Sequence, residues 1–345
     1  MSDSKRVFLT GATGFIGKHI VGALVRGGYE VTALCRSPAP ELVSQGVKVV
    51  LGDVTKIDVI SEAMADCSFV IHAAGAVSRE GPDTRRLMNV HVQGTRNMME
   101  CAIENQVSRF ILLSTSGTIA VGNDPSMVYQ ETDTPPLQVI HRWPYYLSKL
   151  LAERAAFDAL RLAEKAGTEV PALILLNPSL ALGPGDSRGS STGDVARFLR
   201  KEIPIIPSGG LSFVDVRDIA QSAVSSLTKG RDRERYLLGA LNLTMEDFFA
   251  RLEEVSGVQG CLIPVRVPGK IATLGVGLIG TLAKSLGGEA PVSKVDAEMA
   301  SHYWYVDSRK AEEELGFSPR DPMQTLLDTV RDLQGDARPS ARQAS

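Results

Sequence analysis

The sequence predicts an α/β fold in which a doubly wound parallel sheet is joined to a smaller C-terminal lobe. Short apolar segments rich in β-branched residues alternate with longer segments of helical periodicity through the first half of the chain. This is the pattern of repeated βαβ units. Most of the short segments are continuously apolar, as expected of strands covered on both faces. The expected strands are 6–11, 29–35, 47–53, 68–74, 109–115 and 171–177.

The glycine-rich segment TGATGFIG, residues 10–17, follows the first expected strand and precedes a helical segment. Residues without a Cβ allow a tight turn and a close approach of pyrophosphate, and the helix N-terminus offers free N–H groups. The GxxGxxG spacing differs from the commoner GxGxxG, so the prediction depends on context, and a glycine turn without a ligand is the alternative. In this context we expect a Rossmann-type dinucleotide site formed by Gly11, Thr13, Gly14, Phe15, Ile16 and Gly17.

The ends of the next two expected strands indicate which dinucleotide binds. Strand 29–35 is followed by Arg36, where an acidic residue would bind the ribose hydroxyl of NAD. A guanidinium is suited instead to a 2′-phosphate, so NADP(H) is favoured over NAD(H), with a plain surface arginine as the alternative. Strand 47–53 ends in Asp53, followed by Val54. The Asp53 carboxylate is placed to accept a hydrogen bond from the adenine amino group.

The segment WPYYLSK, residues 143–149, places two tyrosines before a lysine. Tyr145 and Lys149 are four residues apart and share one helix face, whereas Tyr146 is turned about 100° away. A free tyrosine has a pKa of about 10. A nearby ammonium lowers this pKa by favouring the phenolate, which suits proton transfer near neutral pH. We therefore expect Tyr145 and Lys149, rather than Tyr146, to act together.

The fifth expected strand ends in three hydroxyl residues, Ser114, Thr115 and Ser116. They fall at the carboxyl edge of the sheet, where ligands bind in folds of this class. A hydroxyl there can donate a hydrogen bond to a substrate carbonyl. A role in the turn alone is the alternative, above all for Ser114.

Together these motifs resemble the extended short-chain dehydrogenase/reductases, from about residue 5 to about 330. Arg36, the TSGT segment and NPS…GPGD resemble the dihydroflavonol-reductase and 3β-hydroxysteroid-dehydrogenase branch. The resemblance implies that Ser116, Tyr145 and Lys149 are catalytic. It also implies a homodimer in which segments 85–105 and 143–165 pair across a two-fold axis. The motifs are TGATGFIG, GDV (52–54), HAAG (72–75), NVHVQGTRN (89–97), STSGT (114–118), YYLSK and NPSLALGPGD (177–186). The implied cofactor contacts, besides the glycine loop, are Ala73, Ala74, Gly75, Asn89, Tyr145, Lys149, Asn177 and Pro178.

Two departures bear on the substrate. Sugar-nucleotide epimerases of the superfamily usually carry VYG after the serine, where this chain has IAVG. They also tend to have an Arg and an Asn–Val before the GP, where this chain has LLNPS. The leading hypothesis is therefore an NADP-dependent reductase or dehydrogenase of a lipophilic or aromatic carbonyl or alcohol. The alternatives are a sugar-nucleotide epimerase or dehydratase with tightly held NAD, and a non-catalytic NADP-binding regulator. The expected substrate residues are Val77, Met127, Tyr129, His141 and Trp143.

The composition limits the other function classes. The 345 residues are 43% hydrophobic and 22% charged with a net charge of −3 and no Lys/Arg block, which argues against nucleic-acid binding. The four cysteines are widely spaced, so we expect no metal site and free thiols in a reducing cytoplasm. The beginning of the chain lacks the pattern of a secretory signal. The apolar stretch 271–283 is shorter than the about 20 residues that span a bilayer.

The change in pattern after Asn177 predicts the domain organisation. Residues 1–177 are expected to form the dinucleotide-binding domain and residues 178–330 most of the substrate-binding lobe. The stretch 211–239 is expected to return to the main fold. Residues 331–345 have little apolar content and are expected to form a disordered tail.

Overall fold

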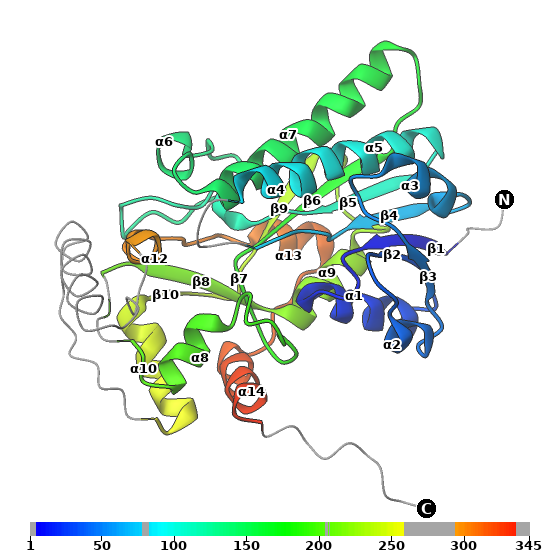
Figure 1. Cartoon of the computed structure of the whole chain (residues 1–345). Helices are drawn as coiled ribbons and strands as arrows, with labels where there is room; N and C mark the ends of the chain where they lie inside the picture. Colours follow the sequence, from blue (N-terminus) through cyan, green and yellow to red (C-terminus); the bar gives the residue numbers. More distant parts are fainter. Residues whose placement is uncertain (1–4, 78–82, 204–205, 207, 259–293, 336–345) are drawn as a thin grey trace, which may run out of the picture.

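The computed structural model of the chain describes residues 5–77, 83–203, 206, 208–258 and 294–335 (Figure 1). Its centre is a seven-stranded sheet in the order β3-β2-β1-β4-β5-β6-β9, and all neighbouring strands are parallel. The predicted doubly wound fold is confirmed. The strand order reverses between β1 and β4, the position at which such sheets bind ligands. The strands are β1 (Arg6–Thr10), β2 (Glu30–Cys35), β3 (Lys48–Leu51), β4 (Phe69–His72), β5 (Arg109–Leu113), β6 (Ala172–Pro178) and β9 (Glu234–Leu238).

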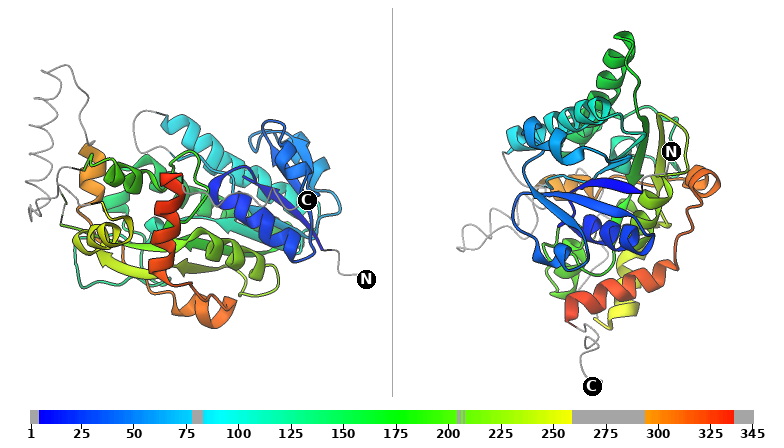
Figure 2. Two further views of the ribbon diagram at one scale, coloured as in Figure 1. Left: turned by 90° about the horizontal axis from the view of Figure 1, so that it is seen from below. Right: turned by 90° about the vertical axis from the view of Figure 1, so that its right-hand side faces the viewer.

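Helices cover both faces of this sheet (Figure 2), which explains why its strands are continuously apolar. One face carries α1 (Phe15–Arg26), α2 (Pro40–Val43), α9 (Val216–Ser225) and α13 (Arg309–Leu315). The other face carries α3 (Ile57–Met64), α4 (Thr84–Met88), α5 (Gly94–Glu104) and α7 (Pro144–Lys165). A π-helical turn, η1 (Asn89–Gln93), joins α4 to α5.

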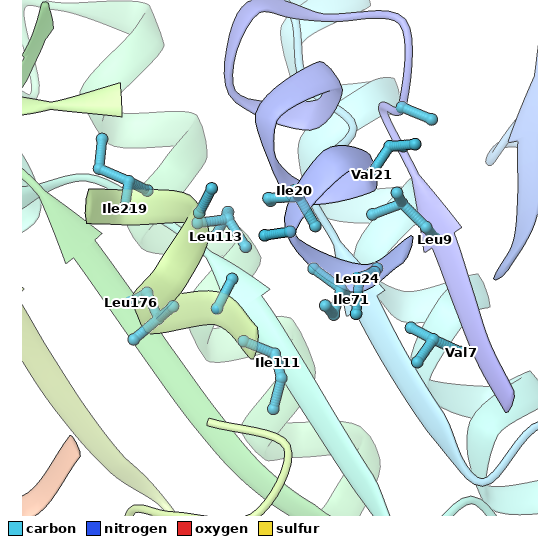
Figure 3. Close-up of a cluster of buried hydrophobic side chains, with 14 of the residues drawn as sticks. Val7, Leu9, Ile20, Val21, Leu24, Ile71, Ile111, Leu113, Leu176 and Ile219 are labelled. Carbon is cyan, nitrogen blue, oxygen red and sulfur yellow. The ribbon is translucent and has the colours of Figure 1, made fainter. Parts of the chain in front are cut away.

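The core on the α1 side consists of interdigitated aliphatic side chains (Figure 3). Apolar residues of α1 recur at helical spacing and meet side chains from the parallel strands and from α9. Burial of each such side chain stabilises the fold by about 1.5–3 kcal/mol. This packing fixes α1 against the sheet and so fixes the loop from which α1 begins. The labelled side chains are Val7, Leu9, Ile20, Val21, Leu24, Ile71, Ile111, Leu113, Leu176 and Ile219.

A second, three-stranded sheet has the order β10-β8-β7. β7 (Leu180–Leu182) pairs in parallel with β8 (Gly210–Asp215), which pairs antiparallel with β10 (Leu241–Thr244). A separate apolar cluster joins this sheet to α8 (Gly193–Leu199), α10 (Met245–Ser256) and α14 (Pro322–Gln334). The remaining described helices are η2 (Ser116–Thr118), α6 (Leu137–Ile140) and α12 (Lys294–Met299).

The stretch 211–239 divides between the two sheets. β9 joins the main sheet beside β6 and α9 contributes to the main core, whereas β8 belongs to the second sheet. The tail predicted for 331–345 begins too early. α14 continues to Gln334 because Leu326, Val330 and Leu333 pack into the lobe core. The apolar stretch 271–283 lies outside the described residues.

Among the described residues, no helix is long and apolar enough to span a membrane. The same part of the chain contains no cluster of metal-ligating side chains suited to a metal ion.

Candidate active site

The glycine loop lies where the sheet reverses its strand order, between the ends of β1 and β4. Gly11 has φ +76°, and a Cβ there would lie 2.5 Å from the backbone carbonyl carbon of Ala73. A Cβ at Gly17 would lie 2.0 Å from the Gly11 carbonyl oxygen. Gly14 is the N-cap of α1 and provides no side-chain cap. The loop therefore has the tight turn and the uncapped helix N-terminus that suit a pyrophosphate.

The end of β4 is held against the glycine loop by Thr10. Its Oγ1 accepts a hydrogen bond from Ala74 N (3.1 Å) and lies 2.7 Å from His72 Nδ1. Burial, helped by the Lys149 ammonium, lowers the pKa of His72 to about 3, so the ring is neutral at neutral pH. This contact fixes the backbone of Ala73 and Ala74, which the sequence analysis assigned to the cofactor.

Arg36 and Asp53 follow the ends of β2 and β3, which are neighbours in the sheet. Arg36 is exposed. Asp53 Oδ1 accepts from Thr55 N (2.9 Å) and Thr55 Oγ1 (2.8 Å). Burial acts to raise the pKa of Asp53, but these hydrogen bonds and the nearby Arg36 guanidinium outweigh it, and the pKa is lowered. Val54 is buried. Its carbonyl accepts a hydrogen bond from Asn97 Nδ2 at 2.9 Å.

Ser116 begins the short turn η2 directly after β5 and is 5% exposed. Thr115 caps this turn, because its Oγ1 accepts a hydrogen bond from Gly117 N. Among the described residues, no hydrogen bond engages the Ser116 hydroxyl, so it is available to a ligand oxygen.

Tyr145 and Lys149 lie in the first turns of α7, four residues apart on one face. Pro144 occupies the first helical position, where a missing N–H costs nothing. Lys149 is 7% exposed and its Nζ donates to the Leu113 carbonyl at the end of β5. Burial lowers the pKa of Lys149 to about 8, although the Glu153 carboxylate acts to raise it. The ammonium therefore persists at neutral pH beside the end of β5.

His91, on the π-helical turn η1, was not singled out by the sequence analysis. Its ring centroid lies 5.8 Å from that of Tyr145 in an edge-on arrangement. Its Nε2 accepts from Ala76 N (3.0 Å), so Nδ1 of the neutral ring carries the proton and donates to Ser148 Oγ (2.8 Å). Burial is the main cause that lowers the pKa of His91 to about 3. His91 thus connects the segment after β4 to α7. Asn89, at the start of the same turn, is exposed.

Asn177 and Pro178 form the end of β6 and are buried. Asn177 Nδ2 donates to Thr115 O (3.0 Å), Thr118 Oγ1 (3.1 Å) and Glu153 Oε1 (2.9 Å). The Thr115 carbonyl and the Glu153 carboxylate oxygen only accept hydrogen bonds, so the amide atom that faces them is the nitrogen. The other amide atom, Oδ1, has no hydrogen-bond partner among the described residues. The amide fixes the turn that carries Ser116.

An aromatic cluster lies beside this turn. Trp143 is 2% exposed and stacks on Trp304, with ring centroids 5.5 Å apart. Tyr146 packs on Trp304 at 5.1 Å and lies over Gly117, where a Cβ would meet the Tyr146 ring at 2.3 Å. The two tyrosines therefore have different surroundings, with Tyr145 against His91 and Tyr146 in the aromatic cluster. Trp143 is buried, so the aromatic rings nearest the turn that carries Ser116 are those of Tyr146 and Trp304.

The residues expected to contact substrate differ in their exposure and contacts. Val77 and Met127 are exposed, at 52% and 36%. Tyr129 is partly buried with its hydroxyl over Gly122. His141 is exposed, and its Nδ1 lies 2.9 Å from the Leu137 carbonyl of its own short helix. Of the five, Trp143 is joined to the turn through Tyr146.

Comparison with known proteins decides the family. A model of the NAD dependent epimerase/dehydratase family matches residues 7–239. The chain belongs to this family. A putative dihydroflavonol 4-reductase of Synechocystis sp. is 30% identical over 339 residues, covering 95% of this chain and 94% of its own. Cinnamoyl-CoA reductase 1 of Oryza sativa subsp. japonica is 29% identical over 268 residues, covering 73% and 76%. The crystal structure of gox2253 matches with a TM-score of 0.80 at 26% identity, covering 97% of this chain and 99% of that one.

These similarities confirm the predicted superfamily and the predicted enzyme class. This member of the epimerase/dehydratase family is an NAD(P)-dependent oxidoreductase. The sequence analysis missed three residues that contact the expected site residues: His91 on η1, Glu153 on α7 itself, and Trp304 in the segment between α12 and α13. One signal was present in the sequence. Glu153 is four residues beyond Lys149 and so continues the Tyr145–Lys149 face.

Proposed function

We propose that this enzyme is an NADP-dependent reductase or dehydrogenase that acts on the carbonyl or alcohol of a lipophilic or aromatic small molecule. The observation that best supports this proposal is the arrangement of side chains on α7. Tyr145 shares a helix face with the buried Lys149 ammonium, while the adjacent Tyr146 forms an apolar aromatic surface with Trp304 beside the Ser116 turn. A proton donor next to such a surface suits reduction of an apolar carbonyl.

In the proposed mechanism the bound nicotinamide cofactor supplies the hydride, and the protein supplies position and the proton. Ser116 donates a hydrogen bond to the substrate oxygen. Tyr145 delivers a proton to that oxygen as it gains negative charge, or removes it in the reverse direction. We propose that Lys149 lowers the pKa of Tyr145 electrostatically and also contacts the nicotinamide ribose. The backbone N–H groups at the N-terminus of α1, which begins at Phe15, bind the pyrophosphate.

The test of this function is a panel of aromatic and aliphatic ketones and aldehydes, read as loss of NADPH absorbance. We expect consumption of NADPH with at least one apolar aromatic carbonyl. The same protein should release no bound NAD on denaturation and should not interconvert UDP-sugars. Tightly bound NAD together with UDP-sugar interconversion would contradict the proposal, because an epimerase retains its cofactor and shows no net consumption.

Cofactor preference is proposed to depend on Arg36, at the end of β2. A charge-assisted hydrogen bond to the 2′-phosphate contributes about 1.5–3 kcal/mol, which is roughly a ten- to hundred-fold difference in Kd. NADPH should therefore bind more tightly than NADH by roughly that factor, and Arg36→Asp should reverse the preference. Fluorescence titration with both cofactors measures this. Arg331→Asp, an equal charge change at an exposed position of α14, is the control. Equal affinity of the unaltered protein for both cofactors would contradict the role of Arg36.

We also propose a cytoplasmic homodimer. Cys35, Cys67 and Cys101 are free, buried thiols, in keeping with a reducing compartment. The outer surfaces of α5 and α7 form a hollow that contains Leu162, which is 65% exposed. Sedimentation at micromolar concentration should give twice the 37.0 kDa chain mass. Leu162→Glu should shift the protein towards monomer, and a monomeric unaltered protein would contradict this assembly.

A further inference from the structure

A buried carboxylate lies at the inner end of the Tyr145–Lys149 face. Glu153 follows Lys149 by one helical turn on α7 and is 1% exposed. Its Oε1 accepts hydrogen bonds from Ser114 Oγ and from Thr118 Oγ1 (3.0 Å), and also from the Asn177 amide at 2.9 Å. Ser116 lies between Ser114 and Thr118 in the chain. One carboxylate oxygen therefore holds both ends of the turn that carries the proposed catalytic serine.

The other carboxylate oxygen, Oε2, faces β9. It lies 3.2 Å from Arg235 Nη2, and the Arg235 side chain is 20% exposed. The angles do not make this contact a hydrogen bond, and Oε2 accepts none from the described residues. The pair is therefore ionic. Glu153 links four parts of the site: α7, the end of β5, the end of β6 and β9.

A charged group at this position needs a physical reason. Burying a carboxylate costs several kcal/mol unless partners compensate. The three hydrogen-bond donors on Oε1 would be satisfied equally well by a neutral amide oxygen. What the charge adds is an ion pair with Arg235 on β9 and a longer-range electrostatic attraction to Lys149, one turn away on α7. Of these two cations, Lys149 is the one that the proposed chemistry uses.

The surroundings of the Lys149 ammonium show why this interaction matters. Among the titratable groups that face it in the described structure, His72 on β4 and His91 on η1 are neutral, since their pKa values are lowered to about 3. Tyr145 on α7 is neutral while it holds its proton. Burial lowers the Lys149 pKa to about 8, and Glu153 is the charge that opposes this effect.

We propose that Glu153 is a positioning residue, which fixes the Ser116 turn relative to Tyr145 and provides the negative charge one helical turn from the Lys149 ammonium. This inference rests on the proposed role of Lys149 in cofactor binding and proton transfer. Glu153 itself does not contact the reacting atoms. Its effect on the site passes through Lys149 by charge, and through Ser114 and Thr118 by hydrogen bonds.

The test is the pH dependence of cofactor affinity, measured by fluorescence titration from about pH 6 to about pH 9.5 with the nicotinamide cofactor that binds more tightly. Cofactor affinity should fall as the pH rises and Lys149 loses its proton. Lys149→Met should abolish this pH-dependent fall in affinity, which is called the step below. Glu153→Gln keeps an oxygen acceptor but removes the charge. A neighbouring opposite charge shifts a pKa by about one to three units. The step should therefore move to lower pH by about one unit or more in Glu153→Gln.

Two further variants complete the experiment. Glu164→Gln makes the same chemical change on the same helix, at a surface residue paired with Arg233, and should leave the step in place. If Glu153→Gln does not fold because Arg235 is left without its partner, the double variant Glu153→Gln/Arg235→Met removes both charges and should show the same shift. A step at the same pH in a folded Glu153 variant, or one that persists in Lys149→Met, would overturn the proposal. Because the measurement is of binding, a protein that reduces no carbonyl in the panel still gives a result.

Discussion

Tyr145→Phe should lower kcat for carbonyl reduction by about 10²–10⁴-fold, the usual contribution of a positioned general acid, and leave cofactor affinity nearly unchanged. The substitution removes one hydroxyl and keeps the ring that packs edge-on against His91. The helix face, Lys149 and the Ser116 turn therefore stay in place. Single-turnover decay of NADPH absorbance measures the chemical step separately from product release.

Tyr146→Phe is the matched control because it removes the same hydroxyl from the next residue of the same helix. The Tyr146 ring packs against Trp304 and over Gly117, and this packing is retained in phenylalanine. We expect a change in kcat below about tenfold, since the proposed proton donor is untouched. Loss of turnover in Tyr146→Phe with activity retained in Tyr145→Phe would show that the wrong tyrosine is assigned.

The fold could be predicted because its determinants are local. The strands from β1 to β6 are short, mostly apolar runs, and most are separated from the next by a helix with one apolar face. The parallel order follows from the crossover helices. The end of the chain was harder to predict. The tail was expected to begin at residue 331, but Leu333 packs against the lobe core through α14, a contact that low apolar content does not reveal.

The candidate site could be predicted where its geometry lies within one element. Tyr145 and Lys149 share a face because α7 is helical there. Glu153 continues this face, but its ion pair with Arg235, which reaches it from β9, joins two distant segments. Trp304 reaches the aromatic cluster because its segment bridges to the loop after β5, where Gly122 pairs with Tyr303. No periodicity within a segment could indicate such contacts between distant segments.

The second large effect is expected in the glycine loop, where Gly17→Ala should weaken cofactor binding by at least about 100-fold, since the pyrophosphate contacts depend on the loop geometry. A Cβ at Gly17 would lie 2.0 Å from the Gly11 carbonyl oxygen and 2.7 Å from its carbon. Both are backbone atoms of the loop, so α1 must move away from β1 or the loop must change shape. Either change misplaces the N–H groups. Forced overpacking of this kind also costs about 1–3 kcal/mol of stability.

Gly22→Ala separates this effect from a general cost of alanine in α1. Gly22 lies on the same helix, and a Cβ there meets first the Arg26 guanidinium at 3.2 Å, the mobile end of a side chain. Alanine in a helix interior is more stable than glycine by about 0.5–1 kcal/mol. Gly22→Ala should therefore raise the free energy of unfolding slightly and keep cofactor affinity, while Gly17→Ala lowers both. Urea unfolding and cofactor titration measure the two quantities. A folded Gly17→Ala variant whose cofactor affinity is within about threefold of that of the unaltered protein would contradict this prediction. Such a loop would accommodate a Cβ at residue 17 without displacing the N–H groups, so the backbone would not need to approach the pyrophosphate closely.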